Sequence, residues 1–166
     1  ERGLVLCCAP SKRQAGIVLA YMRAVFSVPL LAAEIIRETS TGFDLRNGIS
    51  VEVISGDSKT VRGFSLVAAI VDELAFFGVD DTCKYKSDTE LIRALDPGRA
   101  STGGKLICIT SPYAARGWVY ETFQASFGKD SSSILVWKAP SRLMNSTLPE
   151  SVVSEALERD LASASS

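Results

Sequence analysis

The sequence contains no histidine. A Ser-His-Asp hydrolase, a Cys-His protease and a zinc site with histidine ligands are therefore excluded. None of its four cysteines forms a C-x-x-C pair, and Cys7, Cys8 and Cys108 stand in apolar runs, where cysteine behaves as a small hydrophobic residue. We therefore expect reduced thiols, as in a cytosolic protein, and no disulfide framework.

The sequence also lacks an excess of positive charge. Lys and Arg number 18 and Asp and Glu 19, so the net charge is −1 and no broad basic surface for nucleic acid is expected. No apolar run approaches the roughly 20 residues of a membrane span, and the N-terminus has no signal-peptide pattern. The 166 residues, 46% of them hydrophobic, are enough for one domain with its own core.

Apolar runs and helical patterns alternate along the chain. Continuous apolar runs predict buried strands over 3–9, 66–71 and 105–109. Residues 43–53 predict a hairpin that turns at Asn47-Gly48. Further elements are a strand over 134–137 and helices from a Ser11–Gln14 capping box to about 26, and over about 29–38, 88–95, 118–127 and 147–161. The pattern predicts an α/β three-layer sandwich with a mostly parallel sheet.

The most informative motif is the carboxylate pair that ends the apolar run Leu66-Val-Ala-Ala-Ile-Val-Asp72-Glu73. It has the form of a Walker B element. A buried strand holds its last residues rigidly at the sheet edge, where Asp72 can bind Mg²⁺ and Glu73 can orient the water that attacks a γ-phosphate. Acidic residues also often simply end a strand, so the pair alone does not decide the chemistry.

A Walker B element requires a phosphate-binding loop, G-x-x-x-x-G-K-[ST], and the sequence has none. The nearest match, residues 98–106, has an extra glycine, and Leu106 replaces the hydroxyl that would bind Mg²⁺. Lys105 also opens a predicted strand, whereas the lysine of a true loop opens a helix. We expect the loop to lie upstream of Glu1 or to be absent.

Two further polar features accompany the carboxylates. Thr110 and Ser111 end the predicted strand 105–109, where their hydroxyls could sense a γ-phosphate, although Thr-Ser-Pro is also an ordinary exit from a strand. Arg62 precedes the Walker B strand, where an arginine could stabilise charge during phosphoryl transfer. A solvated loop arginine is the simpler interpretation of Arg62.

The ordered set of motifs resembles the ATPase domain of the large terminase subunits of tailed phages. The shared features run over nearly the whole chain, in this order: Pro10-Ser11 and Gln14-Ala15, the Asn47-Gly48 hairpin, Arg62-Gly63, Ile70-Val-Asp72-Glu73, Thr110-Ser111-Pro112 with Gly117 and Tyr120, and a tail that includes Trp137-Lys-Ala-Pro140, Met144-Asn145 and Glu155-Ala-Leu-Glu-Arg-Asp160.

The resemblance implies a P-loop NTPase fold of the ASCE type and an ATP- and Mg²⁺-dependent motor that packages viral double-stranded DNA. It implies Asp72 as the Walker B aspartate, Glu73 as the catalytic glutamate, and Thr110 and Ser111 as the coupling motif. Arg62 stands where some terminases place an arginine that acts on a neighbour's ATP. The implied partners are the capsid portal, the terminase small subunit and further copies in a ring, in the host cytoplasm.

The same resemblance makes residues 1–166 a partial ATPase domain without its Walker A segment and without the nuclease domain that follows, so we expect this piece alone to be inactive. Three alternatives stay open. One is a superfamily 2 helicase fragment, although Leu74-Ala75-Phe76-Phe77 after the acidic pair suits terminases better. The second is a non-catalytic module that keeps the sheet. The third is a metal-dependent nuclease using Asp57, Asp72, Asp80 and Asp81.

Overall fold

The computed structural model describes residues 3–56, 61, 63–79 and 83–159. These residues fall into two compact units, one ending at Tyr120 and the other beginning at Glu121. Within the described ranges, no helix is both long and apolar enough to cross a membrane.

The first unit is built on one sheet. Across the described residues it has six strands in the order β2-β3-β4-β1-β5-β6. β1 lies between β4 and β5, and the pairs β1–β4, β1–β5 and β5–β6 are all parallel, whereas β2–β3 and β3–β4 are antiparallel. The predicted mostly parallel sheet is therefore confirmed. The strands are β1 Gly3–Ala9, β2 Ile35–Glu38, β3 Gly42–Leu45, β4 Ile49–Ser55, β5 Leu66–Asp72 and β6 Lys105–Ile109.

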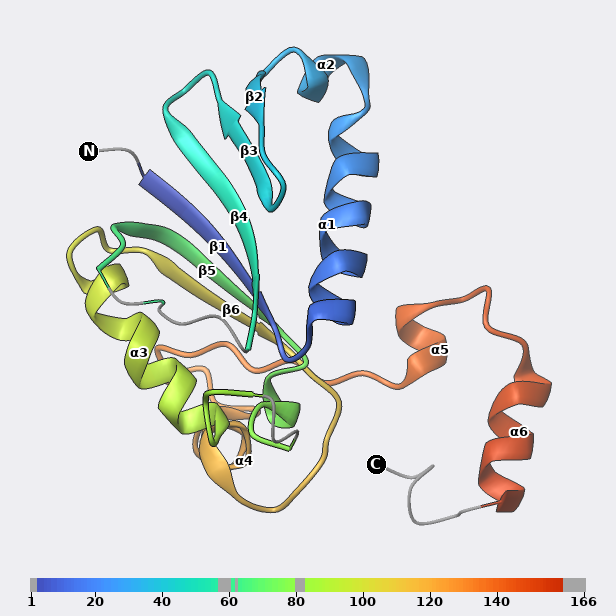
Figure 1. The fold of residues 1–166 in the computed structure, drawn as a ribbon. Coiled ribbons are helices and arrows are strands. Elements are labelled where there is room, and N and C mark those ends of the chain that lie inside the picture. Colours follow the sequence, from blue (N-terminus) through green and yellow to red (C-terminus); the bar gives the residue numbers. More distant parts are fainter. Residues whose placement is uncertain (1–2, 57–60, 62, 80–82, 160–166) are drawn as a thin grey trace. The chain divides into compact units, whose positions relative to one another are not determined.

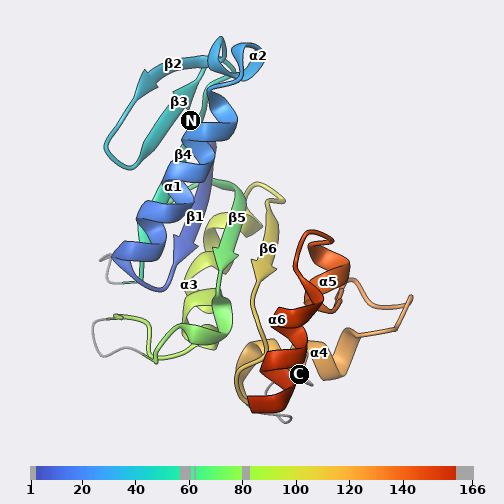
Figure 2. The same cartoon turned by 90° about the vertical axis from the view of Figure 1, so that its right-hand side faces the viewer.

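Helices cover both faces of this sheet, which confirms the three-layer arrangement. α1 (Lys12–Phe26) lies on one face and α3 (Asp88–Ala100) on the other (Figures 1 and 2). The main core lies under α3, because alternate strand residues point to that side. Its members include Leu4, Leu6, Cys8, Leu66, Ala69 and Val71 from the strands and Leu91, Ile92, Ala94 and Leu95 from α3.

The local signals around β1 and the hairpin act as predicted. Ser11 caps α1, because its hydroxyl accepts a hydrogen bond from the Gln14 backbone N–H (3.3 Å) and donates one to Gln14 Oε1 (2.9 Å). Gly48 supplies the left-handed residue (φ 83°) of the turn between β3 and β4. Phe26 of α1 packs on Phe43 of β3 with ring centroids 4.5 Å apart, so the helix is fixed to the hairpin.

The helix predicted over 29–38 is wrong in its second half. Only α2, Pro29–Ala32, is helical, and β2 follows at Ile35. Two successive β-branched residues favour a strand, and β2 finds a partner in β3. The Arg37 guanidinium binds the carboxylate of Asp44 on β3 at 2.8 Å, which strengthens that pairing.

The predicted helix stop at Asp96-Pro97-Gly98 is also wrong, because α3 continues through Pro97 to Ala100. A proline inside a helix removes one backbone hydrogen bond, so the surrounding packing has to offset that loss. Gly98 allows this packing. A Cβ at this position would lie 2.6 Å from the Phe64 carbonyl oxygen, so the end of α3 lies against the backbone that enters β5.

The second unit contains most of α4 (Gly117–Ser126), which begins in the first unit, and all of α5 (Ser141–Met144) and α6 (Glu150–Arg159). α4 confirms the helix predicted over 118–127. The strand predicted over 134–137 is wrong: the segment is irregular and Leu135 is 93% exposed, so its apolar side chains have no sheet to bury them. α6 begins at Glu150, and the Thr147 hydroxyl donates to the Asn145 side chain at 2.6 Å. The predicted helix end at 161 lies outside the described residues.

Candidate functional site

The candidate site lies where the parallel strands β5 and β6 end at the same edge of the sheet. Asp72 is the last residue of β5 and is paired in register with Ile109, the last residue of β6. Glu73 and Thr110 therefore follow on neighbouring strands. The Ala75 backbone N–H donates to the Thr110 hydroxyl at 3.1 Å, which links the two strand ends directly. The structure thus brings the carboxylate pair and the Thr110 hydroxyl together, as the strand pattern predicted.

Glu73 has an unusual backbone. Its φ of 50° and ψ of 45° place it in the left-handed region, and it is the only non-glycine residue with a positive φ within the described residues. For such a residue this conformation costs about 1–2 kcal/mol. Residues held in this way concentrate at functional sites, where the surrounding structure holds them in place.

The Glu73 carboxylate is also unusual. Its Oε2 atom is buried and has no hydrogen-bond partner among the described residues. An unsatisfied buried polar group costs about 1–3 kcal/mol, and each such group in a native structure calls for an explanation. A water or ligand that donates a hydrogen bond to Oε2 would remove this cost, so the carboxylate is prepared to hold a donor.

The short 3₁₀ turn η1, Leu74–Phe76, follows Glu73 directly. Leu74 is fully buried in the core and anchors the turn from inside. Phe76 packs its ring against Tyr113 with centroids 4.8 Å apart. Sequence reasoning did not select Tyr113, whose only signal was an aromatic ring shortly after the Thr110-Ser111-Pro112 motif.

Asp72 supplies the oxygen that Mg²⁺ would require. Alternation along β5 places its side chain on the sheet face opposite to Val71 and the main core, and the residue is half-buried. The described residues contain no cluster of three acidic, Cys or His residues that could hold a metal ion by itself. One carboxylate fits Mg²⁺ bound with a nucleotide, because that ion keeps several waters and takes its other ligands from phosphate oxygens.

The remaining predicted residues differ in how far the structure places them. Ser111 is exposed, and its carbonyl oxygen accepts a hydrogen bond from the Thr110 hydroxyl at 3.0 Å. Arg62 lies outside the described residues. So do Asp57, Asp80 and Asp81, which leaves Asp72 as the only described member of the alternative nuclease set.

Asp88, which sequence reasoning passed over, organises the segment beyond the candidate site. It is buried, and its carboxylate accepts a hydrogen bond from the Val119 backbone N–H at 2.9 Å, near the start of α4. A negative charge there is stabilised by the free N–H groups and the dipole of the helix. A Cβ on Gly117 would lie 2.7 Å from Asp88 Oδ1, so this contact requires glycine.

The cysteines take no part in the site. Burial raises the pKa of Cys7 to about 11 and that of Cys8 and Cys108 to about 12. The neighbouring Cys7 and Cys108 thiols add a smaller upward contribution at Cys8, whereas Arg99 opposes the shift at Cys108. The thiols therefore stay protonated at neutral pH, in keeping with their expected role as small hydrophobic residues.

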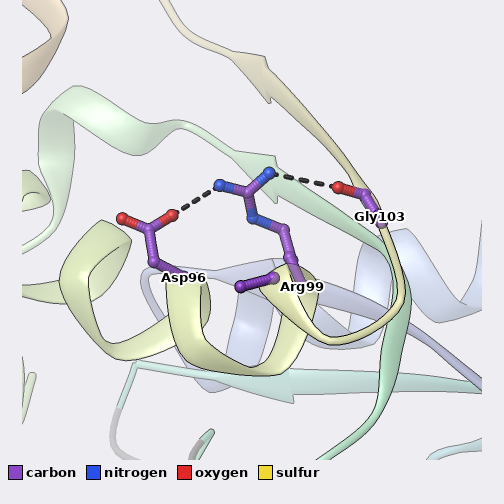
Figure 3. Close-up of a pocket in the computed structure, with 5 residues that line it drawn as sticks. Asp96, Arg99 and Gly103 are labelled. Carbon is purple, nitrogen blue, oxygen red and sulfur yellow. Dashed lines mark hydrogen bonds and ion pairs between the residues drawn. The ribbon is translucent and has the colours of Figure 1, made fainter.

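The rejected loop candidate at 98–106 lies at the end of the strands opposite to Asp72 and Thr110. It runs from the last turn of α3 into β6, the reverse of a strand-to-helix phosphate loop, and it borders a cavity of about 360 Å³ (Figure 3). Arg99 binds the Asp96 carboxylate at 2.5 Å and the Gly104 carbonyl at 3.2 Å. The Gly104 N–H donates to the Arg99 carbonyl. The two terminal nitrogens of Arg99 and the Gly104 N–H are thus occupied by internal bonds and are not free to bind a phosphate.

A mostly parallel sheet between two helix layers, with acidic residues at the end of an interior strand, is the architecture of P-loop NTPases of the ASCE type. Comparison with solved structures finds the same fold in two phage large terminases. The chain is similar to the bacteriophage HK97 large terminase (19% identity, TM-score 0.66, 96% of this chain and 37% of that chain). It is also similar to the large terminase ATPase domain of Thermus phage P74-26 (21% identity, TM-score 0.51, 73% of this chain and 52% of that chain).

These similarities confirm that the chain has the fold of terminase ATPase domains, as the resemblance implied. The chain spans about a third of the HK97 protein and about half of the P74-26 one. No model of a protein family matches the sequence, and no curated protein matches it either. Similarity at this level of identity carries the fold, and the chemistry has to be argued from the residues at the strand ends.

Proposed function

We propose that this chain is part of the ATPase domain of a tailed-phage terminase large subunit, and that the intact protein hydrolyses ATP to drive double-stranded viral DNA into a capsid. One observation carries the chemical part of the proposal. Glu73 combines a strained backbone with a buried carboxylate oxygen that has no partner among the described residues, at the end of an interior strand. Unfavourable features of this kind concentrate at functional sites, and here two of them meet at one acidic residue.

In this proposal the two carboxylates have separate roles. Asp72 holds Mg²⁺ on the face of β5 away from the main core. Glu73 accepts a hydrogen bond from the attacking water and polarises it, which also satisfies Oε2. ATP with Mg²⁺ supplies the phosphoryl group and the remaining metal ligands. Two neighbouring residues can take these different roles, because the strand ends at Asp72 and the chain changes direction at Glu73.

A phosphate-binding segment upstream of Glu1 completes the proposed site. β6 is the edge strand of the described sheet. Its Ile107 and Ile109 side chains are 47% and 56% exposed. A further parallel strand at this edge would pair with β6, and a loop at its end would lie beside Asp72. We place the Walker A strand there and the nuclease domain after residue 166.

The wider context of the proposed motor comes from the resemblance. We propose a ring of copies that acts with the terminase small subunit at the capsid portal, in the host cytoplasm. Arg62 would stabilise the transferred phosphoryl charge, either in its own site or in that of a neighbour. Mixing Arg62→Ala with wild-type subunits separates these cases, because action in trans makes inhibition depend on the subunit ratio in a non-linear way.

The test of the enzymatic proposal is Glu73→Gln in the intact protein. Glutamine keeps the size of the side chain but removes its charge and basicity, so we expect ATP turnover to fall at least about 100-fold while ATP affinity is retained. The matched control is Glu121→Gln, a surface residue of α4, which should leave turnover unchanged. Near-normal turnover in Glu73→Gln would remove Glu73 from the catalytic role.

A non-catalytic module is the second candidate, because the described residues contain no phosphate cradle. The coding sequence upstream of Glu1 separates the two. A G-x-x-x-x-G-K-[ST] motif after a predicted strand supports the motor, whereas a start codon with no such motif supports the module.

A further inference from the structure

The turn that presents Glu73 is supported from the neighbouring strand. The Ala75 N–H donates to the Thr110 hydroxyl at 3.1 Å, across 35 residues of sequence. The Phe76 ring packs against Tyr113 at 4.8 Å. Both contacts join η1 to the segment that follows β6. Within the turn, the Phe76 N–H donates to the Glu73 carbonyl at 2.9 Å, so its geometry includes the Glu73 backbone itself.

The hydrogen bonds of Thr110 show which role its hydroxyl can take. A threonine hydroxyl has one proton to donate. In this structure the Thr110 proton goes to the Ser111 carbonyl at 3.0 Å, and the oxygen accepts from Ala75. Donation to a phosphate oxygen would require the first of these bonds to break. The hydroxyl is therefore already committed to the two backbone segments that it joins.

We propose that Thr110 and Tyr113 are positioning residues that hold the η1 turn and thereby keep Glu73 in its left-handed conformation, and that Thr110 does not contact the nucleotide. The inference rests on the catalytic role proposed for Glu73. The conformation of Glu73 is intrinsically unfavourable, so it needs an external support. The Ala75–Thr110 bond and the Phe76–Tyr113 contact supply one close to the strained residue.

The test compares Thr110→Val, which keeps the side-chain volume but removes the acceptor, with Thr110→Ser, which keeps the hydroxyl. In the intact protein we expect Thr110→Val to lower kcat about tenfold, in line with the loss of one hydrogen bond, with the Kd for ATP unchanged. Thr110→Ser should restore kcat. Tyr113→Ala should also lower kcat, and Tyr113→Phe should not, because the ring makes the contact.

Thr102→Val is the matched control. Thr102 also joins backbone segments through its hydroxyl, which donates to the Leu66 carbonyl and accepts from the Gly104 N–H, but at the opposite end of β5. It should leave kcat unchanged even if stability falls. A Thr110→Val protein that binds ATP more weakly, or that keeps wild-type kcat, would overturn the proposal.

Amide hydrogen exchange gives a readout that does not depend on ATPase activity. The Ala75 N–H should exchange about tenfold faster in Thr110→Val than in the wild type or in Thr110→Ser. If the wild-type protein does not turn over ATP, the function proposed above fails, and Ala75 exchange still decides whether Thr110 holds the turn. Unchanged exchange at Ala75 would refute the support itself.

Discussion

Replacing Glu73 by alanine or glycine should stabilise the protein while removing the proposed activity. Alanine deletes the buried oxygen that has no partner, which is worth about 1–3 kcal/mol. It also deletes one half-buried methylene, Cγ, which is worth at most about 0.8 kcal/mol. The net gain in the free energy of unfolding should be about 1 kcal/mol.

Glycine should add to this gain. It adopts a φ of 50° without the steric cost of about 1–2 kcal/mol that alanine retains. Against this, glycine makes the unfolded chain more flexible, which costs about 0.4–1 kcal/mol. We therefore expect the stability order glycine, alanine, wild type, with glycine about 0.5–1 kcal/mol above alanine.

Urea unfolding of the intact protein measures these differences as shifts of the midpoint at constant m-value. Trp118 packs partly buried against the main core and reports the first unit, and replacing the exposed Trp137 by Phe in every variant removes its signal. Glu73→Gln serves as the comparison, since it retains both the backbone strain and a polar group. If alanine and glycine are no more stable than the wild type, Glu73 carries no unfavourable energy and the argument for a prepared site fails.

Two further predictions concern the surrounding fold. Because burial raises the pKa of three thiols above the ordinary value of 9, they stay protonated when the unfolded chain would ionise. The contribution of the Cys7, Cys8 and Cys108 thiols to the free energy of unfolding should therefore be constant below about pH 9 and fall as the pH rises from 9 towards 11. Urea unfolding at several pH values between about 8 and 11 checks this. Gly117→Ala should destabilise more than Gly103→Ala in the same assay, because both glycines have a positive φ but only Gly117 also contacts the Asp88 carboxylate.

The sequence predicts elements whose signals are local. β1 and β5 are continuous apolar runs, and α1 begins at a capping serine, so each can be recognised without its neighbours. The errors arise where distant partners decide. Residues 35–38 become a strand because β3 is available to pair with them, and α3 passes Pro97 because it packs against the backbone entering β5. In 134–137 the apolar pattern is present but no strand pairs with it.

In the candidate site, too, the sequence predicts the features with local signals and misses those that depend on distant residues. A strand that ends in two carboxylates predicts the position of Asp72 and Glu73 at the sheet edge, and the parallel topology brings Thr110 beside them. The left-handed backbone of Glu73 has no signal in the sequence, because the residues that we propose support it lie more than 35 positions away. The role assigned to Thr110 changes for the same reason, since only the structure shows that its hydroxyl already binds Ala75 and Ser111.

β6 lies between the proposed phosphate-binding strand and the turn that presents Glu73. Its last residue leads into Thr110, which binds the Glu73 turn, and its outer edge and the exposed Ile107 and Ile109 side chains face no other strand among the described residues. Alternation places Asp72 on the same sheet face as Ile109. A parallel strand added at this edge would bring its terminal loop to the same end of the sheet as Asp72 and, by fixing β6, would also fix the support of Glu73. Binding of the phosphate segment and orientation of the catalytic carboxylate would then depend on one strand, which is how a completed sheet could control turnover.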